Sequence, residues 1–280
     1  MSLPDPAAET SPRGRLLAAA LRLLAVGGPE ALQARRLAAE VGTSTMAVYT
    51  HFGGMGQLIT EVVREGYISF GRRLAEAPRG DDPVADLLAL GMAYRDYALE
   101  QPQLYRLMFR TTAPVGLRSG VDQPVAAVAG TLPEAQAAFA QLVELVTRVM
   151  EASDGPAQES PAAAGFQLWS AVHGYVLLEI AGFFRGDGQS VSHFLLPLLA
   201  KLTVGVGADP EHAARCARQI AATRLLPQRA TGRSPLGTSP DGGRDDPAAR
   251  SRYAPPNTLR SHSVPIRNLG KTRPAWSSRR

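Results

Sequence analysis

The side chains best suited to contact another molecule lie in an eighteen-residue run near the N-terminus, RRLAAEVGTSTMAVYTHF, from Arg35 to Phe52. Apolar residues recur in it at helical spacing, including Leu37 and Val48, and they allow two short helices to cross closely. Gly42 supplies the tight turn between the two helices, and Ser44 is expected to cap the second one. The pattern predicts a helix-turn-helix.

The second of these helices carries side chains that suit duplex DNA. Its hydroxyl groups match phosphate oxygens or base edges, and the methyl-bearing Met46 and Ala47 match the methyl group of thymine. A helix of this kind enters the major groove with one face. The residues expected on that face are Thr45, Met46, Ala47, Tyr49 and Thr50.

The run GTSTMAVYTHFGGMGQL, preceded by ARRLAAEV, resembles the DNA-binding domain of the tetracycline-repressor (TetR/AcrR) family. The most specific marks are the glycine at the turn and the ending Tyr49-x-His51-Phe52. The resemblance covers residues 12 to 65 closely and the layout of the ligand domain loosely. It implies that the recognition helix contacts DNA and that Arg35 does so from the helix before it, while Arg36 touches backbone or solvent. The implied DNA-binding set is Arg35, Arg36, Ser44, Thr45, Met46, Ala47, Tyr49, Thr50 and His51.

Two positions depart from the family pattern. Met55 stands where members usually carry a lysine that binds phosphate, and Gln33-Ala34 stand where the helix before the turn usually opens with Ser or Thr. Each lost phosphate contact lowers the salt dependence of DNA binding by about one unit. A modest DNA affinity is therefore expected.

A second string, FQLWSAVHGY, runs from Phe166 to Tyr175. Trp169 and His173 are four residues apart, so their rings are expected to be neighbours on one helix face, and Gly174 permits close approach of another helix. The string resembles the WHG-type ligand-binding domain of one branch of the same family. That resemblance implies a homodimer in which helices near 162–185 and 190–206 form a four-helix interface.

Aromatic and apolar side chains of this region are candidates for a pocket that binds a small-molecule effector, because helical bundles place such cavities between helices. The alternative is ordinary packing, which is the commoner role of aromatic residues at helical spacing and of a lone histidine on an apolar face. The candidates are Tyr94, Tyr97, Leu104, Phe109, Phe166, Trp169 and His173.

The elements that position these residues are all expected to be helices. Ser11-Pro12 is a typical helix start and Gly27-Gly28-Pro29 a typical stop. A longer helix is expected after Gly53-Gly54, with an apolar face formed by Leu58, Ile59, Val62 and Val63. Alternating β-branched runs are scarce, so the predicted class is all-α. Beyond a polar linker at 78–83, helices are predicted at 83–100, 102–110, 124–152, 162–185, 190–206 and 210–225.

The chain has 280 residues, enough for one large or two modest domains. Residues 229–280 hold 11 basic and 3 acidic side chains, a net charge of +8, whereas the rest of the chain has a net charge of −3. The high isoelectric point therefore reflects the tail, which is rich in Pro, Ser, Gly and Arg and is expected to be disordered. The tail either adds non-specific DNA affinity or is a passive extension. The predicted domains are 11–60 for DNA, 61–226 for ligand and dimerisation, and 227–280 for the tail.

Several classes of protein are not expected. The most apolar run, 171–184, contains His173 and Glu179, so no membrane span is predicted, and without a signal peptide the protein is expected in the cytoplasm. Cys216 is the only cysteine; Arg215 and Arg218 beside it could favour a thiolate, although a passive cysteine is the preferred interpretation. No catalytic constellation, cofactor motif or metal-ligand spacing is found, so no catalytic residue, cofactor or metal is predicted.

The hypothesis from the sequence is a sequence-specific DNA-binding transcriptional regulator that acts as a ligand-released repressor. It is expected to be a homodimer whose recognition helices lie about 34 to 36 Å apart on a near-palindromic operator. Effector binding would shift the helix that starts near Met55 and release the DNA, with a coupling of about 1 to 3 kcal/mol. One alternative is a helical ligand-binding protein with weakened or no DNA binding. Another is an enzyme built on a helical bundle, for which no substrate is suggested.

Overall fold

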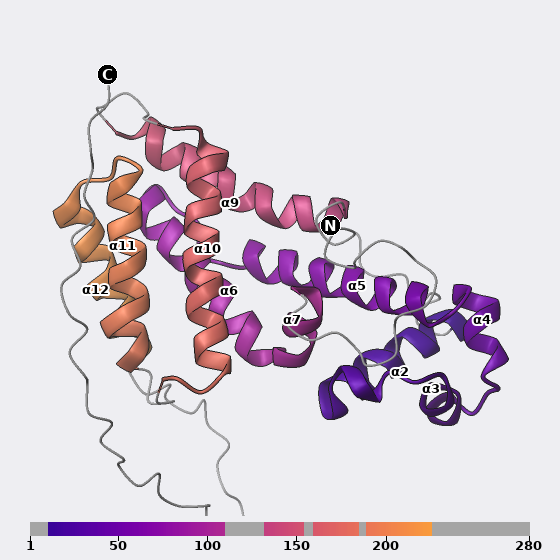
Figure 1. Cartoon of the computed structure of the whole chain (residues 1–280). Coiled ribbons are helices and arrows are strands. Elements are labelled where there is room, and N and C mark those ends of the chain that lie inside the picture. Colours follow the sequence, from indigo (N-terminus) through magenta and orange to yellow (C-terminus); the bar gives the residue numbers. More distant parts are fainter. Residues whose placement is uncertain (1–10, 110–131, 154–158, 185–188, 226–280) are drawn as a thin grey trace, which may run out of the picture. The chain divides into compact units, whose positions relative to one another are not determined.

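The computed structural model describes residues 11–109, 132–153, 159–184 and 189–225 (Figure 1). Over these residues the secondary structure is helical and contains no strand, which confirms the predicted all-α class. No helix in these ranges is long and apolar enough to cross a membrane. The predicted tail, 227–280, lies outside the described residues.

Three short helices form the N-terminal group: α2 (Pro12–Gly27), α3 (Ala34–Val41) and α4 (Met46–Phe52), with a 3-10 turn η1 (Pro29–Ala31) after α2. The predicted start of α2 is confirmed, because the Ser11 hydroxyl accepts a hydrogen bond from the Gly14 amide at 3.0 Å. Leu16, Leu37 and Val48, one from each helix, are fully buried. This shared core fixes the angle at which α3 and α4 cross.

The next helix, α5 (Met55–Ala75), is 21 residues long and carries a continuous apolar stripe. The stripe buries Leu58 and Val62 at its start, as predicted, and continues to Phe70 and Leu74. The helix packs against α2 and α4 near its start and against α9 further along. The boundary predicted between residues 60 and 61 falls inside this unbroken helix.

The remaining helices form a bundle around α6 (Pro83–Glu100), which packs against α5, α9, α10, α11 and α12. Their bounds are α7 (Pro102–Met108), α9 (Pro133–Glu151), α10 (Pro161–Ile180), α11 (Leu196–Gly205) and α12 (Pro210–Leu225). Asp82 begins α6, because its carboxylate accepts hydrogen bonds from the amides of Val84 and Ala85 at 3.0 and 3.2 Å. The fold therefore joins α5 to the bundle core through the short linker 76–82.

Two predicted helices end or divide differently in the structure. Helix α10 stops at Ile180 instead of 185, since Gly182 adopts a left-handed conformation with φ 83° and the Phe183 amide folds back to the Leu178 carbonyl at 3.0 Å. The single helix expected at 190–206 is a π-helical turn η2 (Val191–Leu195) followed by α11. Pro197 explains the wider turn, because it has no amide to donate and its ring crowds the preceding turn.

Two other helices are also shorter than predicted. Helix α7 ends at Met108 rather than at 110. Helix α9 begins at Pro133 rather than at 124, and most of the difference, 124–131, lies outside the described residues.

Candidate DNA-binding surface and ligand cavity

In the turn between α3 and α4 the glycine has the role that the sequence predicts, but the residue that caps α4 differs from the prediction. Gly42 is left-handed with φ 70°, and the Thr43 amide closes the end of α3 on the Ala38 carbonyl at 2.8 Å. The expectation that Ser44 caps α4 is wrong. Thr45 holds the cap position without a side-chain hydrogen bond, and the first turn is closed by the Ala47 amide on the Ser44 carbonyl at 3.0 Å. The exposed Ser44 hydroxyl is therefore not used in capping α4.

Helix α4 has one buried and one exposed face. Val48 and Phe52 are buried, whereas Met46 and Tyr49 are 67% and 54% exposed. Thr45 and Thr50 are also exposed, and Ala47 and His51 are half-buried. A large thioether and a phenol that lie one turn apart and face solvent are typical of a contact surface rather than of a core.

The charge around this surface is positive. Residues 11–60 contain five arginines and two glutamates, and both Arg35 and Arg36 are exposed on α3. Met55, which replaces the family lysine, is half-buried against the core. Helix α5 starts after Gly54 without a side-chain cap, so its first backbone amides suit a phosphate. Phosphate contact at this position would then come from backbone rather than from a lysine.

A small cavity lies between α5, α6, α9 and α10. Its volume is about 50 Å³ and its walls are almost entirely apolar. Of the seven residues predicted for a pocket, Tyr94 and Trp169 line it. The other lining residues are Tyr67, Phe70, Leu74, Leu87, Leu90, Gly91, Ala135, Ala138, Phe139, Leu142, Leu168, Val172 and Leu199.

Sequence reasoning missed the contribution of α5 to this cavity. Tyr67 and Phe70 are nearly completely buried, and they extend the apolar stripe that was recognised only up to Val63. The same helical spacing, continued one and two turns further, would have found both.

A chain of hydrogen bonds runs beside the cavity from Trp169 to His173. The Trp169 indole donates to the Tyr94 hydroxyl at 3.0 Å, and the hydroxyls of Tyr94 and Tyr105 lie 2.8 Å apart. The Tyr105 oxygen lies 2.6 Å from Nδ1 of His173, and the Tyr94 oxygen lies 3.1 Å from the same atom. When Tyr94 donates to Tyr105 and Tyr105 donates to His173, every contact along the chain from Trp169 to His173 is a hydrogen bond, and the 3.1 Å contact between Tyr94 and Nδ1 carries no proton.

The protonation of this chain follows from its burial. Burial lowers the pKa of His173, so that its imidazole is neutral and Nδ1 accepts. Burial also raises the pKa of both Tyr94 and Tyr105, which keeps their hydroxyls protonated as donors. Tyr105 is fully buried and belongs to α7, and the sequence analysis did not identify it.

The other predicted pocket residues lie near the cavity without lining it. The ring of Phe109 contacts those of His173 and Trp169, with centroids 4.7 and 6.0 Å away. The Tyr97 hydroxyl donates to the Gly66 carbonyl at 2.9 Å, and Leu104 is buried.

Phe166 is 53% exposed and packs against Phe139, with 4.4 Å between ring centroids and the rings tilted by 31°. Helix α10 also carries an exposed stripe at every fourth residue: Phe166, Ser170, Gly174 and Leu178. The expected close approach of a helix at Gly174 does not occur within the chain, since a Cβ there would meet no described atom within 4 Å. This face of α10 is open.

Comparisons with known proteins agree on one family. The sequence model described as "Bacterial regulatory proteins, tetR family" matches residues 16–62, and "Tetracyclin repressor-like, C-terminal domain" matches residues 87–202. An uncharacterized HTH-type transcriptional regulator of Mycobacterium tuberculosis is 30% identical over 203 residues, which cover 71% of this chain and 84% of that protein.

Solved structures share the fold. The protein SCO4313 is 27% identical with a TM-score of 0.52, over 73% of this chain and 98% of its own. A tetR-family transcriptional regulator from Streptomyces coelicolor is 20% identical with a TM-score of 0.53, over 75% and 88% of the two chains. RolR in complex with resorcinol is 16% identical with a TM-score of 0.53, over 78% and 95%.

Proposed function

Since the chain belongs to the tetR family of bacterial regulatory proteins and is a DNA-binding transcriptional regulator, we propose that it is a homodimeric repressor that a small molecule releases from its operator. The observation that carries this proposal is the continuity of α5. One end of this helix packs against α2 and α4, and its second half supplies Tyr67, Phe70 and Leu74 to the cavity. A helix shared by the two sites moves both when it shifts.

The small volume of the cavity explains why a bound ligand would shift α5. Its volume of about 50 Å³ is far below the several hundred Å³ typical of ligand pockets. A ligand must therefore widen it and push α5 away from α6, α9 or α10. The ligand then binds more tightly to the conformation in which the cavity is wide and α4 has moved. Such a difference in affinity between two conformations is what allostery requires.

A second connection runs through α7. Tyr105 links this helix to His173 on α10, and α7 also packs against α2 and α5. The contact with α5 is close at Gly66, where a Cβ would lie 2.7 Å from the sulfur of Met108. Because Gly66 has no side chain, the Met108 side chain packs directly on the backbone of α5, and we infer that α7 transmits a change at the hydrogen-bond chain to α2 and α5.

The walls of the cavity define the class of effector. They are apolar and aromatic, and the polar side-chain atoms of the lining residues are the hydroxyls of Tyr67 and Tyr94 and the indole nitrogen of Trp169. We propose a small, largely apolar, planar molecule with one polar group that reaches Tyr94. RolR, which has the same fold, has been crystallised with resorcinol.

The proposed dimer is supported by apolar side chains left open on one chain. Phe166 and Leu178 are 53% and 46% exposed on the stripe of α10, and Phe183 and Phe194 are 74% and 56% exposed. Gly174 in the middle of the stripe would let the same helix of a second copy approach closely. Two copies joined by α10 and the η2–α11 segment would carry two recognition helices to successive major grooves, about 34 to 36 Å apart.

The DNA-binding proposal assigns the exposed face of α4 to base edges and the surrounding positive charge to phosphates. The proposed contacts are Arg35, Arg36, Ser44, Thr45, Met46, Ala47, Tyr49, Thr50 and His51.

The test is selection of binding sites from random duplex DNA with the full chain, followed by mobility-shift titration on the enriched site. We expect a near-palindromic site, loss of binding in Tyr49→Ala, and unchanged binding in Val26→Ala, a control that truncates a side chain 92% exposed at the end of α2. Both variants should sediment as dimers. Failure to enrich any sequence, or full affinity in Tyr49→Ala, would overturn the assignment; the former result would favour a ligand-binding protein without an operator.

A further inference from the structure

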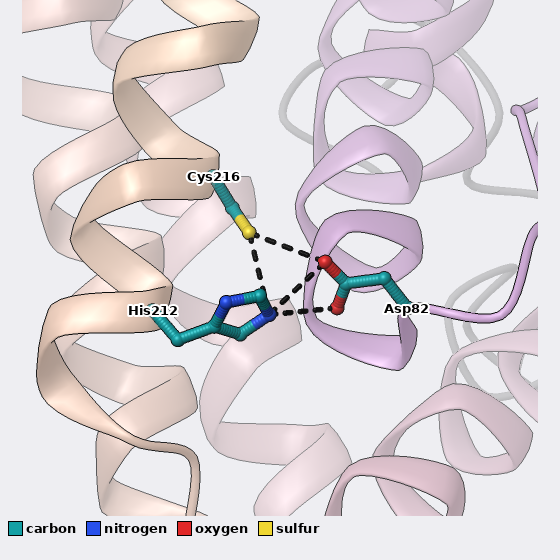
Figure 2. A group of neighbouring side chains, drawn as sticks. All are labelled: Asp82, His212 and Cys216. Carbon is teal, nitrogen blue, oxygen red and sulfur yellow. Dashed lines mark hydrogen bonds and ion pairs between the residues drawn. The ribbon is translucent and has the colours of Figure 1, made fainter.

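Three potential metal ligands, none of which lines the cavity, meet where the start of α6 lies beside α12 (Figure 2). Asp82 comes from the end of the linker that precedes α6, and His212 and Cys216 lie one turn apart on α12. Nε2 of His212 lies 3.0 Å from each carboxylate oxygen of Asp82 and 3.6 Å from Sγ of Cys216. The thiol lies 3.4 Å from Oδ2 of Asp82.

We propose that Asp82, His212 and Cys216 form a binding site for a divalent transition-metal ion of the zinc type. A carboxylate, an imidazole and a thiolate are the three protein ligands that Zn²⁺ takes, and this mixture of hard and soft donors does not suit Mg²⁺ or Ca²⁺. Three protein ligands leave a fourth position of the tetrahedron for water or another small ligand.

The donor atoms already have the separations that such an ion demands. With ordinary Zn–O, Zn–N and Zn–S bond lengths and tetrahedral angles, the oxygen and nitrogen ligands lie about 3.4 Å apart and each lies about 3.6 Å from the sulfur. The observed separations are 3.0 Å for oxygen and nitrogen, 3.6 Å for nitrogen and sulfur, and 3.4 Å for oxygen and sulfur. Shifts of a few tenths of an ångström complete the geometry.

The same arrangement argues against a catalytic cysteine triad. In a triad the carboxylate holds one ring nitrogen of the histidine and the nucleophile faces the other. Here Asp82 and Cys216 both face Nε2, and Nδ1 faces Arg215 at a distance of 3.5 Å. Donors that converge on one point suit an ion rather than a proton relay.

In the metal-free protein Asp82, His212 and Cys216 form a hydrogen-bonded cluster, and metal binding would change the protonation of the thiol and the imidazole. Burial and the hydrogen bond to Asp82 raise the pKa of the Cys216 thiol to about 11, which is opposite to the thiolate weighed from the neighbouring arginines. Burial works to raise the pKa of the Asp82 carboxyl, but hydrogen bonds from His212, Ala85 and Cys216 lower it. Binding of Zn²⁺ would form the Zn–S bond as the thiol proton leaves to solvent, and the imidazole proton would move from Nε2 to Nδ1 while exposed Arg215 turns away.

The backbone around the site is held in place without an ion. Asp82 caps α6, and the nearby Asp86 carboxylate accepts hydrogen bonds from the Gly80 amide at 2.9 Å and from Arg148 at 2.8 Å. Cys216 is 3% exposed, whereas the side chains of Asp82 and His212 are 39% and 37% exposed, which leaves a path from solvent. A bound ion would therefore fix α12 to the linker between α5 and α6.

The experiment uses the full chain without a polyhistidine tag, reduced and stripped of metal, and titrates it with Co²⁺. We expect a thiolate-to-cobalt charge-transfer band that saturates at one equivalent and disappears on addition of Zn²⁺. Cys216→Ala should abolish the band. His212→Gln and Asp82→Asn should weaken Zn²⁺ binding at least about 100-fold, measured against a chromophoric chelator, because even indirect metal contacts are worth 10- to 100-fold.

Two controls separate this site from other effects. Asp82→Asn keeps an amide oxygen that caps α6 as well as aspartate does, so loss of the metal would not reflect an unravelled helix. His193→Gln removes an exposed histidine of η2, outside the three-ligand cluster, and should leave Co²⁺ and Zn²⁺ binding unchanged. Absence of a thiolate band in the wild-type chain, or Zn²⁺ affinity unchanged in Cys216→Ala and His212→Gln variants that retain wild-type circular dichroism, would overturn the proposal.

Discussion

Removal of one hydroxyl from the buried hydrogen-bond chain should lower the free energy of unfolding by a measurable amount. In Tyr105→Phe the ring remains in place, but the hydroxyl that lies 2.6 Å from Nδ1 of His173 and 2.8 Å from the Tyr94 hydroxyl is lost. Tyr94, at 3.1 Å from Nδ1, can turn to donate to His173 in its place. One hydrogen bond is then lost outright without leaving the imidazole unpaired.

The expected destabilisation is about 1 to 2 kcal/mol, since a typical internal hydrogen bond contributes about 1 kcal/mol and the buried Tyr94 oxygen also loses one of its neighbouring polar groups. For a folded region of this size, that corresponds to a decrease of roughly 2 to 8 °C in the melting temperature. The assay is urea unfolding followed by circular dichroism, in which the midpoint should fall while the slope stays constant.

The matched control is Tyr67→Phe in the same aromatic cluster. Among the residues that the structure describes, the Tyr67 hydroxyl has one partner, the Met108 carbonyl at 3.5 Å, so its loss should cost less than about 0.5 kcal/mol. A double-mutant cycle of Tyr105→Phe with His173→Gln should give a coupling energy of about 1 kcal/mol. Equal stability of the two phenylalanine variants, or a coupling near zero, would refute the hydrogen-bond chain.

Four further predictions follow from the DNA surface, the cavity, the dimer and the buried histidine. Arg35→Gln should reduce the slope of log affinity against log salt by about 0.9, as expected for one phosphate contact; an unchanged slope places Arg35 away from the DNA. Ala138→Met should fill the cavity, so that DNA binding persists while an effector found by thermal-shift screening no longer releases the DNA; full release would place the effector elsewhere. Leu178→Arg should sediment as a monomer and lose affinity for a two-half-site operator, whereas Leu99→Arg, on an exposed part of α6, should remain dimeric. Burial lowers the pKa of His173, so the unfolded chain takes up a proton at this residue before the folded chain does as the pH falls below about 6.5. The free energy of unfolding should therefore decrease by at most about 1.4 kcal/mol per pH unit and level off below the pKa of the folded state. His173→Gln should flatten this pH dependence relative to the wild-type chain, and an unchanged profile would contradict the prediction.

Much of the helical framework was accessible from local signals in the sequence. Ser11 acts through its hydroxyl on the turn that follows it, and Gly42 and the Gly53-Gly54 pair act through their own backbone. The start of α2, the turn after α3 and the separation of α4 from α5 are therefore confirmed. The cap assigned to Ser44 is wrong because α4 begins one residue later than its sequence suggests, and backbone hydrogen bonds close its first turn.

The sites were less accessible, because they depend on contacts between distant segments. Tyr105 has no motif around it, and it becomes part of the chain to His173 only when α7 folds against α10. The proposed metal site joins Asp82 to two residues on α12 that are 130 and more positions away. A single cysteine and a histidine four residues before it do not form a recognisable metal motif, so only the folded chain brings the third ligand to them.

The proposed regulator acts by placing the exposed face of α4 in the major groove twice per dimer. Methylation interference on the enriched operator tests it directly, because a methyl group on guanine N7 lies in the major groove and one on adenine N3 lies in the minor groove. If α4 of each subunit reads the major groove, methylated guanines interfere in two clusters about one helical turn apart. Interference from adenine N3 alone, or from a single cluster with dimeric protein, would contradict it.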